Sequence, residues 1–273
     1  MIDFTRLTPA GMHNPRIKQF LGIKKNTKSN PEDLTCLEGL WELSRAFKAN
    51  LELRAFFLCP ELLRGDEAKR LAEIIVETGV HSYLVSEKVI RNIMDRDDPD
   101  GLAAIVRLPH FTWSDIQLRQ QNRLVVLDGL EIPGNIGTIV RCADSTGADG
   151  IVITNRRTRL SHPKLIHSSM GSLFTFPVIE AEIHEAIAWL HNHQFRIITT
   201  DTEAPLSYKR ADYRGRIAIV MGSERYGIVE EWHQAQDSSV FIPMQGTVDS
   251  LNVGNAAVLM LYEAFYQQEP VRF

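Results

Sequence analysis

The segment from Arg123 to Thr154 carries the pattern that most restricts the fold. An uninterrupted apolar run, LVVL at 124–127, is followed by a turn-rich loop at 128–137 (DGLEIPGNIG), a helical stretch at 138–146 and a second apolar run, GIVIT at 150–154. Apolar runs without alternation are typical of strands in a parallel sheet that is buried on both faces. Two such strands with a helix between them predict a βαβ unit.

Later segments extend this α/β pattern to the end of the chain. Apolar stretches at 196–200, 216–221 and 239–242 alternate with helical patterns at 182–193 and 228–234. Parallel strands joined by helices form a sheet with helices on both faces, and ligands bind at the carboxyl ends of its strands. We therefore predict a mostly parallel sheet over 123–273, with a ligand site along that edge.

The first half of the chain predicts a smaller α/β domain of its own. We expect strands at 53–59, 82–85 and 102–106, and helices at 34–51, 67–78 and 86–94. About 100 residues are enough for a small independent core. The segment between the halves is polar and lacks periodicity, so we divide the chain into a domain at 1–108, a connector at 109–122 and a domain at 123–273.

Charge is unevenly distributed along the chain. The net charge is −4, yet the first 30 residues contain one acidic side chain and six basic ones. A local basic segment can bind a polyanion even when the whole chain is acidic. A solvated charged surface is the alternative interpretation. The basic residues of this segment are Arg6, Arg16, Lys18, Lys24, Lys25 and Lys28.

Cysteine usage and hydropathy restrict the compartment. Cys36, Cys59 and Cys142 are far apart and odd in number, which argues against a disulfide framework and fits a reducing cytoplasm. The chain has no apolar run of about 18 residues, as a membrane span needs, and its first residues lack the apolar region of a secretory signal. We expect a cytoplasmic protein without a membrane segment.

The stretch 242–269 combines the end of a strand, a polar loop and an amphipathic helix. Pro243 stops the strand, and Asp249 or Ser250 offers an N-cap oxygen to the helix. A loop held in this way, with Ser250 and Asn252 in it, can present fixed backbone groups to a small ligand. An ordinary β–α connection is the alternative. The helix has one apolar face, made by Val253, Ala256, Ala257, Met260, Leu261 and Ala264.

Two further loops follow strands and contain the residue types of a site. Gly134-Asn135-Ile136-Gly137 precedes Arg141, which we place near the first turn of the next helix, pointing back at the loop. The loop 222–227 (GSERYG) has glycines at both ends, which permit tight turns, and its Glu224 could also cap the following helix. The glycine spacing does not match G-x-G-x-x-G, which disfavours a dinucleotide site, and we expect no metal site.

Together, the three loops resemble the three motifs of the SpoU (TrmH-like) family of RNA ribose 2′-O-methyltransferases, of the SPOUT class. The motifs read NIGTIVRCADSTGADGIV at 135–152, IVMGSERYGI at 219–228 and IPMQGTVDSLNVGNAAVLMLYEA at 242–264. SSMGSLFTFPV at 168–178 is also similar to the family. The segments 14–40 and 101–109 resemble, more weakly, its ribosomal-protein-like RNA-binding domain. The resemblance departs at Gly254, where the family commonly has serine, and we expect altered capping or packing there.

The resemblance implies a fold, a cofactor and a partner. It implies a deep trefoil knot at the C-terminus, an S-adenosylmethionine site and a homodimer with its active site at the interface. The cofactor would lie against the backbone near Gly222, Ile242 and Leu251, and we add Thr200 and Met244 to this site. The helix from Val253 onward would pack against both the sheet and the partner subunit. The RNA would be bound by Arg16, Lys18, Lys24, Lys25 and Lys28.

The chemistry of 2′-O-methylation assigns roles to the polar residues of the loops. A ribose hydroxyl is a poor nucleophile, so the site must position it, remove its proton and stabilise the charge that develops on oxygen. Arg141 is the candidate for the charge, because a guanidinium can hold a phosphate or the 2′-oxygen. Asn135 and Asn252 can bond substrate or cofactor, Glu224 can orient Arg141 or its loop, and Ser250 can hold the loop. The proton acceptor stays open between phosphate, water and a perturbed group.

The favoured function is therefore RNA 2′-O-methylation that depends on S-adenosylmethionine, and ribosomal RNA is the favoured substrate. A transfer-RNA methyltransferase and a non-catalytic RNA-binding protein with this fold are the alternatives. A nucleotide-dependent oxidoreductase is disfavoured by the glycine spacing. The target nucleotide, and a role in antibiotic resistance or in housekeeping modification, stay open.

Overall fold

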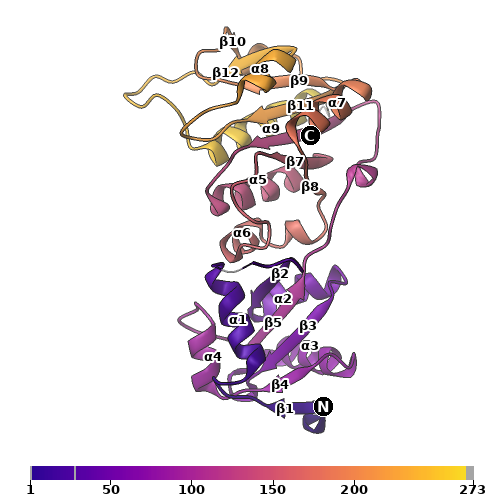
Figure 1. Ribbon diagram of the computed structural model, residues 1–273, viewed down its shortest axis with the longest axis vertical. Helices are drawn as coiled ribbons and strands as arrows, with labels where there is room; N and C mark the ends of the chain where they lie inside the picture. Colours follow the sequence, from indigo (N-terminus) through magenta and orange to yellow (C-terminus); the bar gives the residue numbers. More distant parts are fainter. Residues whose placement is uncertain (1, 28, 269–273) are drawn as a thin grey trace. The chain divides into compact units, whose positions relative to one another are not determined.

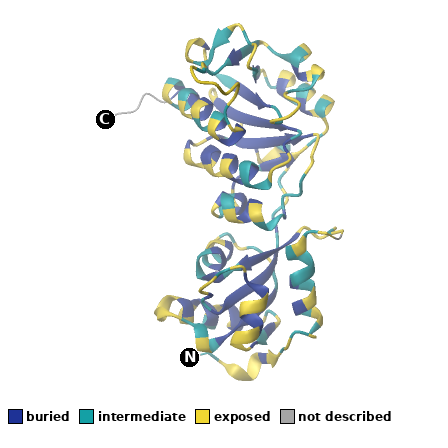
Figure 2. Cartoon of the chain, turned by 90° about the vertical axis from the view of Figure 1, so that its left-hand side faces the viewer, coloured by how far each residue is buried: buried dark blue, intermediate teal, exposed yellow. Residues whose placement is uncertain are grey.

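The computed structural model describes residues 2–27 and 29–268, so Lys28 of the expected basic segment lies outside the described residues. The chain forms two compact units. The first comprises Met1–Pro109 with Leu160–Pro163, and the second comprises His110–Arg159 with Lys164–Phe273. Figure 2 shows the strands of each unit as its buried part, with exposed residues on the outer faces of the helices.

The first unit contains a five-stranded mixed sheet in the order β1-β4-β3-β5-β2 (Figure 1). β1, β4 and β3 run parallel, whereas β5 is antiparallel to both β3 and β2. Its strands are β1 (Leu7–Pro9), β2 (Leu34–Glu38), β3 (Leu53–Leu58), β4 (Ser82–Leu84) and β5 (Leu102–Arg107). Its helices are η1 (Phe4–Arg6), α1 (Pro15–Lys25), α2 (Gly39–Lys48), η2 (Pro60–Leu62), α3 (Gly65–Glu77) and α4 (Glu87–Ile93).

The expectation of one helix over 34–51 is wrong at its beginning. Residues 34–38 form β2, which pairs with β5 and is buried. Gly39, the first residue of α2, adopts a φ of +86°, a conformation open to glycine. The apolar residues at 34–38 do not distinguish a strand from a helix, because a short buried strand and a buried helix have the same composition.

The second unit contains a seven-stranded sheet in the order β10-β12-β9-β11-β6-β7-β8. Every neighbouring pair is parallel, which confirms the α/β architecture. The strands are β6 (Asn122–Asp128), β7 (Gly150–Thr154), β8 (Val178–Glu180), β9 (Arg196–Thr200), β10 (Leu206–Ser207), β11 (Arg216–Met221) and β12 (Ser238–Phe241). The helices are η3 (Trp113–Asp115), α5 (Pro133–Ser145), α6 (Pro163–Ser169), η4 (Ser172–Phe174), α7 (Ile183–Asn192), η5 (Tyr208–Arg210), α8 (Glu230–Ala235) and α9 (Val253–Gln268).

Helices cover both faces of this sheet. On one face, Leu124 and Val126 of β6 pack with Leu190 of α7 and the fully buried Trp232 of α8. Side chains alternate along a strand, so Val125 and Leu127 point to the opposite face. There α5 contacts β7, α9 contacts β11, and the two helices pack side by side (Figure 1). The apolar face expected on α9 is buried, apart from the half-buried Ala256.

Helix α5 begins five residues earlier than expected, so the position given to Arg141 near its first turn is wrong. Pro133 occupies the first helical turn, where its missing N–H and fixed φ are favourable. Asn135 and Gly137 are therefore helical. A Cβ on Gly137 would lie 2.1 Å from Ser168 Oγ and 2.5 Å from the Leu165 carbonyl oxygen. This glycine therefore permits the close approach of α6, and it is not a turn residue.

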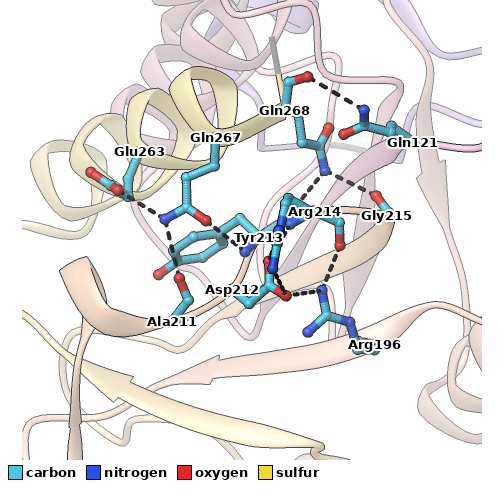
Figure 3. Close-up of polar contacts among 10 residues, drawn as sticks. All are labelled: Gln121, Arg196, Ala211, Asp212, Tyr213, Arg214, Gly215, Glu263, Gln267 and Gln268. Carbon is cyan, nitrogen blue, oxygen red and sulfur yellow. Dashed lines mark hydrogen bonds and ion pairs between the residues drawn. The ribbon is translucent and has the colours of Figure 1, made fainter. Parts of the chain in front are cut away.

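The C-terminal end of α9 is fastened to the segment before β11 by the side-chain amides of Gln267 and Gln268 (Figure 3). Gln268 donates from Nε2 to the carbonyl oxygens of Tyr213 (2.6 Å) and Gly215 (2.9 Å). Its Oε1 accepts a hydrogen bond of 2.9 Å from the buried Arg123 at the start of β6. Gln267 accepts from the Tyr213 amide at 3.0 Å. These bonds fix the last turn of α9 at the amino ends of β6 and β11.

Candidate functional site

A cavity of about 320 Å³ opens at the carboxyl ends of three neighbouring strands of the second unit, β9, β11 and β12. This is the edge where the sequence predicted a ligand site. Its walls are the segments that follow these strands and the first turn of α9. The lining residues are Thr200, Asp201, Thr202, Met221, Gly222, Ser223, Glu224, Gly227, Ile228, Val240, Phe241, Ile242, Met244, Asp249, Ser250, Leu251, Val253 and Ala256.

One wall of the cavity is a tight hairpin at 223–227. Ser223 and Gly227 exchange two backbone hydrogen bonds of 2.9 Å, and Ser223 Oγ accepts a 3.0 Å bond from the Tyr226 amide. Gly227 has a φ of +67°. A Cβ on Gly222 would lie 2.3 Å from the Gly227 carbonyl carbon. Both glycines are therefore needed for the hairpin to close against the end of β11.

Three polar side chains, from the first turn of α5, the hairpin after β11 and the residue before α9, form a hydrogen-bonded network beside this cavity. Asn252 donates from Nδ2 to Oδ1 of Asn135 over 3.2 Å, and Asn135 in turn donates from Nδ2 to the Glu224 carboxylate. Glu224 therefore holds Asn135, whereas the sequence suggested that it orients Arg141 or caps a helix. Glu224 lines the cavity, so these hydrogen bonds connect the cavity to the first turn of α5.

Asn252 has a second role that the sequence gave to Asp249 or Ser250. Its Oδ1 accepts the Gly254 amide at 3.0 Å, so Asn252 is the residue that caps α9. Asp249 and Ser250 lie too far before the first helical residue for this bond, and both line the cavity. A Cβ on Gly254 would lie 3.1 Å from the same Oδ1, so the glycine leaves room for the capping amide.

Arg141 lies on the exposed side of α5, with Thr138 and Ser145 at the helical spacing i−3 and i+4. No described residue forms an ion pair or hydrogen bond with its guanidinium, and it does not line the cavity. The guanidinium is therefore available to a ligand that reaches α5 from solvent. Asn135 and its partners join the first turn of α5, the helix that carries Arg141, to the cavity.

The carboxylate of Asp128, to which the sequence gave no role, joins the ends of β6 and β7 to the segment after the hairpin. Asp128, the last residue of β6, is buried, and its Oδ1 accepts bonds of 2.9 Å from Thr154 Oγ1 and from Asn155 Nδ2. Its Oδ2 accepts the Val229 amide at 3.2 Å, just after the hairpin. An acid directly after an apolar strand was the available signal, since a buried carboxylate needs several donors.

All five residues expected to hold a cofactor line the cavity, namely Thr200, Gly222, Ile242, Met244 and Leu251. Ile242 and Leu251 are half-buried, so they belong to the cavity wall and not to the core. Of the residues expected to act in catalysis, Glu224 and Ser250 line the cavity. Asn135 and Asn252 are bonded to Glu224 or to each other beside it, whereas Arg141 has no such bond and does not line it. The Thr200 hydroxyl donates to the Val220 carbonyl at 2.9 Å and so joins β9 to β11 at the cavity.

The basic residues of α1, in the first unit, differ in how far their charge is balanced. The charge of Lys24 is balanced within the unit: its Nζ lies 2.8 Å from Glu38 Oε1 and 2.8 Å from Asp95 Oδ1, and its side chain is 13% exposed. Arg16 donates to Gln19 at 2.7 Å. Lys18 and Lys25 are exposed and lie seven residues apart, on one side of the helix.

The described residues offer neither a reactive thiol at Cys142 nor a cluster of metal ligands. Burial raises the pKa of the Cys142 thiol on α5 to about 11, so this cysteine is protonated near neutral pH and is no nucleophile. In residues 2–27 and 29–268, no three His, Cys, Asp or Glu side chains gather as metal ligands would. Within the same residues, no helix has the length and apolar character needed to cross a membrane. The described part of the site therefore offers a cavity for binding and a network of polar side chains for positioning.

The fold and the cavity define a parallel α/β domain that binds a small ligand at the carboxyl ends of its strands. Comparison with known proteins names the family. The chain belongs to the SpoU rRNA methylase family, whose model matches residues 122–262, and this confirms the resemblance found in the sequence. A second model, the MRM3-like substrate binding domain, matches residues 14–104.

Individual relatives cover almost the whole chain. The chain is 25% identical to the 23S rRNA (guanosine(2553)-2′-O)-methyltransferase RlmP of Bacillus subtilis, over 91% of this chain and 95% of that protein. It is 28% identical to the 23S rRNA (adenosine(1067)-2′-O)-methyltransferase of Streptomyces azureus, over 94% of each. The crystal structure of an AdoMet-bound rRNA methyltransferase from Sinorhizobium meliloti has a TM-score of 0.84 and 26% identity, over 95% of this chain and 97% of that one.

Proposed function

We propose that this chain transfers the methyl group of S-adenosylmethionine to a ribose 2′-hydroxyl of ribosomal RNA. The observation that carries the proposal is the cavity at the ends of β9, β11 and β12, which lies beside the hydrogen-bonded residues Asn252, Asn135 and Glu224. Asn135 shares α5 with Arg141, whose guanidinium has no partner among the described residues. Relatives of similar length are named as 23S rRNA 2′-O-methyltransferases, which favours ribosomal RNA over transfer RNA.

The cavity fits the cofactor in size and chemistry. Its volume of about 320 Å³ lies within the usual range for small-ligand sites, which is about 300–1,000 Å³. Ile242, Leu251 and Val253 offer apolar surface to a base, and Asp201 and Glu224 offer carboxylates to a cationic ligand. Two of the similar crystal structures contain AdoMet. When bound, S-adenosylmethionine supplies an electrophilic methyl group on a positively charged sulfur.

The residues of this chain would position the ribose and stabilise its oxygen. Arg141 would hold the phosphate next to the target ribose or the 2′-oxygen itself, since a guanidinium forms paired charge-assisted hydrogen bonds with oxyanions. Asn135 is kept in one orientation by Glu224 and Asn252, so its amide is preorganised at the rim of the cavity. A protonated Arg141 is no base, and the proton of the 2′-hydroxyl goes to phosphate, water or another acceptor.

We propose that the C-terminal segment forms the trefoil knot of the SPOUT class. After β12, at one side of the sheet, the chain runs along the cavity and then forms α9, which packs on α5 and contacts β11. The segment 242–252 between β12 and α9 therefore crosses the strand ends in the direction of β6. The last segment of a trefoil knot must cross back over the sheet in this way. We also propose a homodimer that uses α9, because Leu259, Tyr262 and Tyr266 form an exposed apolar stripe on that helix.

The first unit is proposed to bind the RNA. Its segment 14–104 matches a substrate-binding model, and Lys18 and Lys25 give α1 an exposed basic side. RNA binding by such residues depends on phosphate contacts and weakens as salt is added. A reducing compartment such as the cytoplasm is proposed because all three cysteines are free thiols.

Transfer of label from S-adenosyl-[methyl-³H]methionine to unmodified 23S rRNA tests the proposal. Digestion to nucleosides should place the label in one 2′-O-methylated nucleoside, and unmodified transfer RNA should receive much less. Label in a methylated base would contradict the reaction, and preferential labelling of transfer RNA would contradict the substrate. RNA binding without transfer would favour a non-catalytic protein that has kept the fold.

A further inference from the structure

The hairpin at 223–227 carries an aromatic ring that the cavity does not use. Ser223, Glu224 and Gly227 line the cavity, whereas Arg225 and Tyr226, at the tip between them, do not. The Tyr226 side chain is 71% exposed, which is the highest exposed fraction of any large apolar side chain in residues 2–27 and 29–268. Single exposed apolar side chains are common on protein surfaces. Tyr226 differs in its position, because it stands at the tip of a hairpin whose flanking residues line the cavity.

The tip is held rigidly although its side chains are exposed. The two backbone bonds between Ser223 and Gly227 close the hairpin, and Ser223 Oγ accepts the Tyr226 amide at 3.0 Å. The Arg225 guanidinium lies 5.1 Å from the centre of the Tyr226 ring. The base of the hairpin is fastened by Gly222, which packs against Gly227. The backbone that carries the ring and the cation is therefore held in a defined position next to the cavity.

We infer that Tyr226 stacks on a base of the RNA at or beside the target nucleotide, with Arg225 bound to the adjoining phosphate. Unpaired bases of RNA are bound by stacking on aromatic side chains and on arginine planes. Glu224, on the same hairpin, is bonded to Asn135, so the hairpin backbone has a fixed relation to the hydrogen-bonded network beside the cavity. This inference rests on the proposed function and deepens it, since it names how the nucleotide is held.

The bound cofactor is the other aromatic ligand that could meet this ring. The geometry favours RNA, because Tyr226 does not line the cavity and faces solvent. A second copy of the protein is a third candidate, since it could cover the ring in a dimer. Three measurements separate these ligands: affinity for RNA, affinity for S-adenosylmethionine, and the mass of the particle in solution.

The test compares full-length variants for binding and methylation of unmodified 23S rRNA transcribed in vitro. Tyr226→Ala and Tyr226→Leu should raise the Kd and KM for RNA by about 5- to 150-fold, because a stacked base contributes about that much affinity. Tyr226→Phe and Tyr226→Trp keep an aromatic face and should stay within about twofold of the wild type. Val248→Ala removes another exposed apolar side chain, 60% exposed in the loop before α9, and serves as the matched control.

Each outcome decides the inference. It holds if the Ala and Leu variants lose RNA affinity while the Kd for S-adenosylmethionine and the sedimentation coefficient are unchanged. Equal RNA affinity of Tyr226→Leu and wild type, an equal loss of cofactor affinity, or dissociation of a dimer would overturn it. If the wild type binds RNA without methylating it, the proposed function fails while the binding comparison still tests Tyr226. If it neither binds nor methylates ribosomal or transfer RNA, both fail.

Discussion

Asn252 and Asn135 lie 117 positions apart in the sequence and are joined by a hydrogen bond of 3.2 Å from Nδ2 to Oδ1. Asn252 also caps α9 through its own Oδ1, and Asn135 also donates to Glu224. The beginning of α9, the first turn of α5 and the hairpin after β11 are therefore held together by two amides and a carboxylate. Asn252 therefore has two roles: its Oδ1 stabilises the start of α9, and its Nδ2 orients Asn135. Substitutions that keep only one of these atoms should separate the two roles.

Asn252→Asp separates these two roles. Aspartate keeps the oxygen that accepts the Gly254 amide, and it is as good an N-cap as asparagine. It has no donor for Asn135, so turnover should fall on the order of tenfold, the equivalent of one hydrogen bond. The free energy of unfolding should stay near that of the wild type. Asn252→Ala should lose turnover and also about 1 kcal/mol of stability in urea titrations. Full turnover of Asn252→Asp would show that the bond to Asn135 has no role.

Arg141→Ala should remove methyl transfer with little effect on the cofactor. Loss of a charged donor to a developing oxyanion reduces kcat by about 10²–10³-fold. The Kd for S-adenosylmethionine, measured by calorimetry, should change by no more than a few fold, because Arg141 lies outside the cavity. Arg141→Lys keeps the charge but loses the paired geometry and should recover activity only in part. Ser145→Ala, on the same exposed side of α5, is the control. Unchanged turnover of Arg141→Ala would rule out the role given to this residue.

Two glycines of α5 should respond to alanine in opposite directions. A Cβ on Gly137 would lie 2.1 Å from Ser168 Oγ, and the nearby Leu165 carbonyl oxygen belongs to the backbone and cannot rotate away. Gly137→Ala should therefore cost about 1–3 kcal/mol of unfolding free energy through overpacking. Nothing lies within 4 Å of a Cβ on Gly134, so Gly134→Ala should be neutral or stabilise by up to about 1 kcal/mol. Equal effects of the two changes in denaturant titrations would contradict the close contact between α5 and α6.

Gln268→Ala should be costly for one side chain at the end of a helix. The buried amide makes three hydrogen bonds. Two go to the carbonyl oxygens of Tyr213 and Gly215 (Figure 3), and the third comes from Arg123. Leaving such groups without these partners costs about 1–3 kcal/mol. Gln267 is half-buried, so water can replace its bonds, and Gln267→Ala should cost less. Thermal unfolding that ranks the two variants the other way would show that the end of α9 does not depend on the buried amide.

Stability should decrease above pH 9 because the thiols of Cys36, Cys59 and Cys142 are buried, and burial raises the pKa of each. Burial raises the pKa of Cys142 to about 11, and burial together with the Glu61 carboxylate raises the pKa of Cys59 to about 12. Between pH 9 and 11 the unfolded chain loses these protons while the folded chain keeps them. The folded state then binds more protons, so the free energy of unfolding falls as pH rises, by up to about 1.4 kcal/mol per pH unit for each thiol. Below pH 9 the contribution of the thiols is fully present.

The thiol contribution can be isolated by comparing slopes. The variant Cys59→Ala/Cys142→Ala should show a shallower decrease of unfolding free energy between pH 9 and 11. The slopes of variant and wild type should agree between pH 6 and 8. Identical slopes above pH 9 would mean that the thiols ionise equally in both states.

The sequence predicted the strands of the second unit and the wall of the cavity because both depend on local pattern. Apolar runs mark β6, β7, β9, β11 and β12 within a few residues, and residues directly after a strand end must lie at the carboxyl edge. The short β8 and β10 were missed, since two or three residues at a sheet margin carry no periodic signal.

What the sequence could not predict depends on long-range partners. The early start of α5 was not predicted because a segment rich in glycine and proline resembles a loop, and the close packing that requires Gly137 involves α6, which comes later in the chain. The capping role of Asn252 needed the position of the first turn of α9. Lys24 reads as a free cation in the sequence, because its partners Glu38 and Asp95 come from elsewhere in the chain.

Mapping of 2′-O-methyl groups in the RNA of cells with and without this protein tests the central proposal most directly. We predict that one or a few ribose positions in ribosomal RNA lose methylation when the protein is absent. Expression of the wild type should restore them, whereas Arg141→Ala should not. An unchanged ribosomal map, or a loss confined to transfer RNA, would contradict the proposed substrate, and a map unchanged in all RNA would contradict methyl transfer itself.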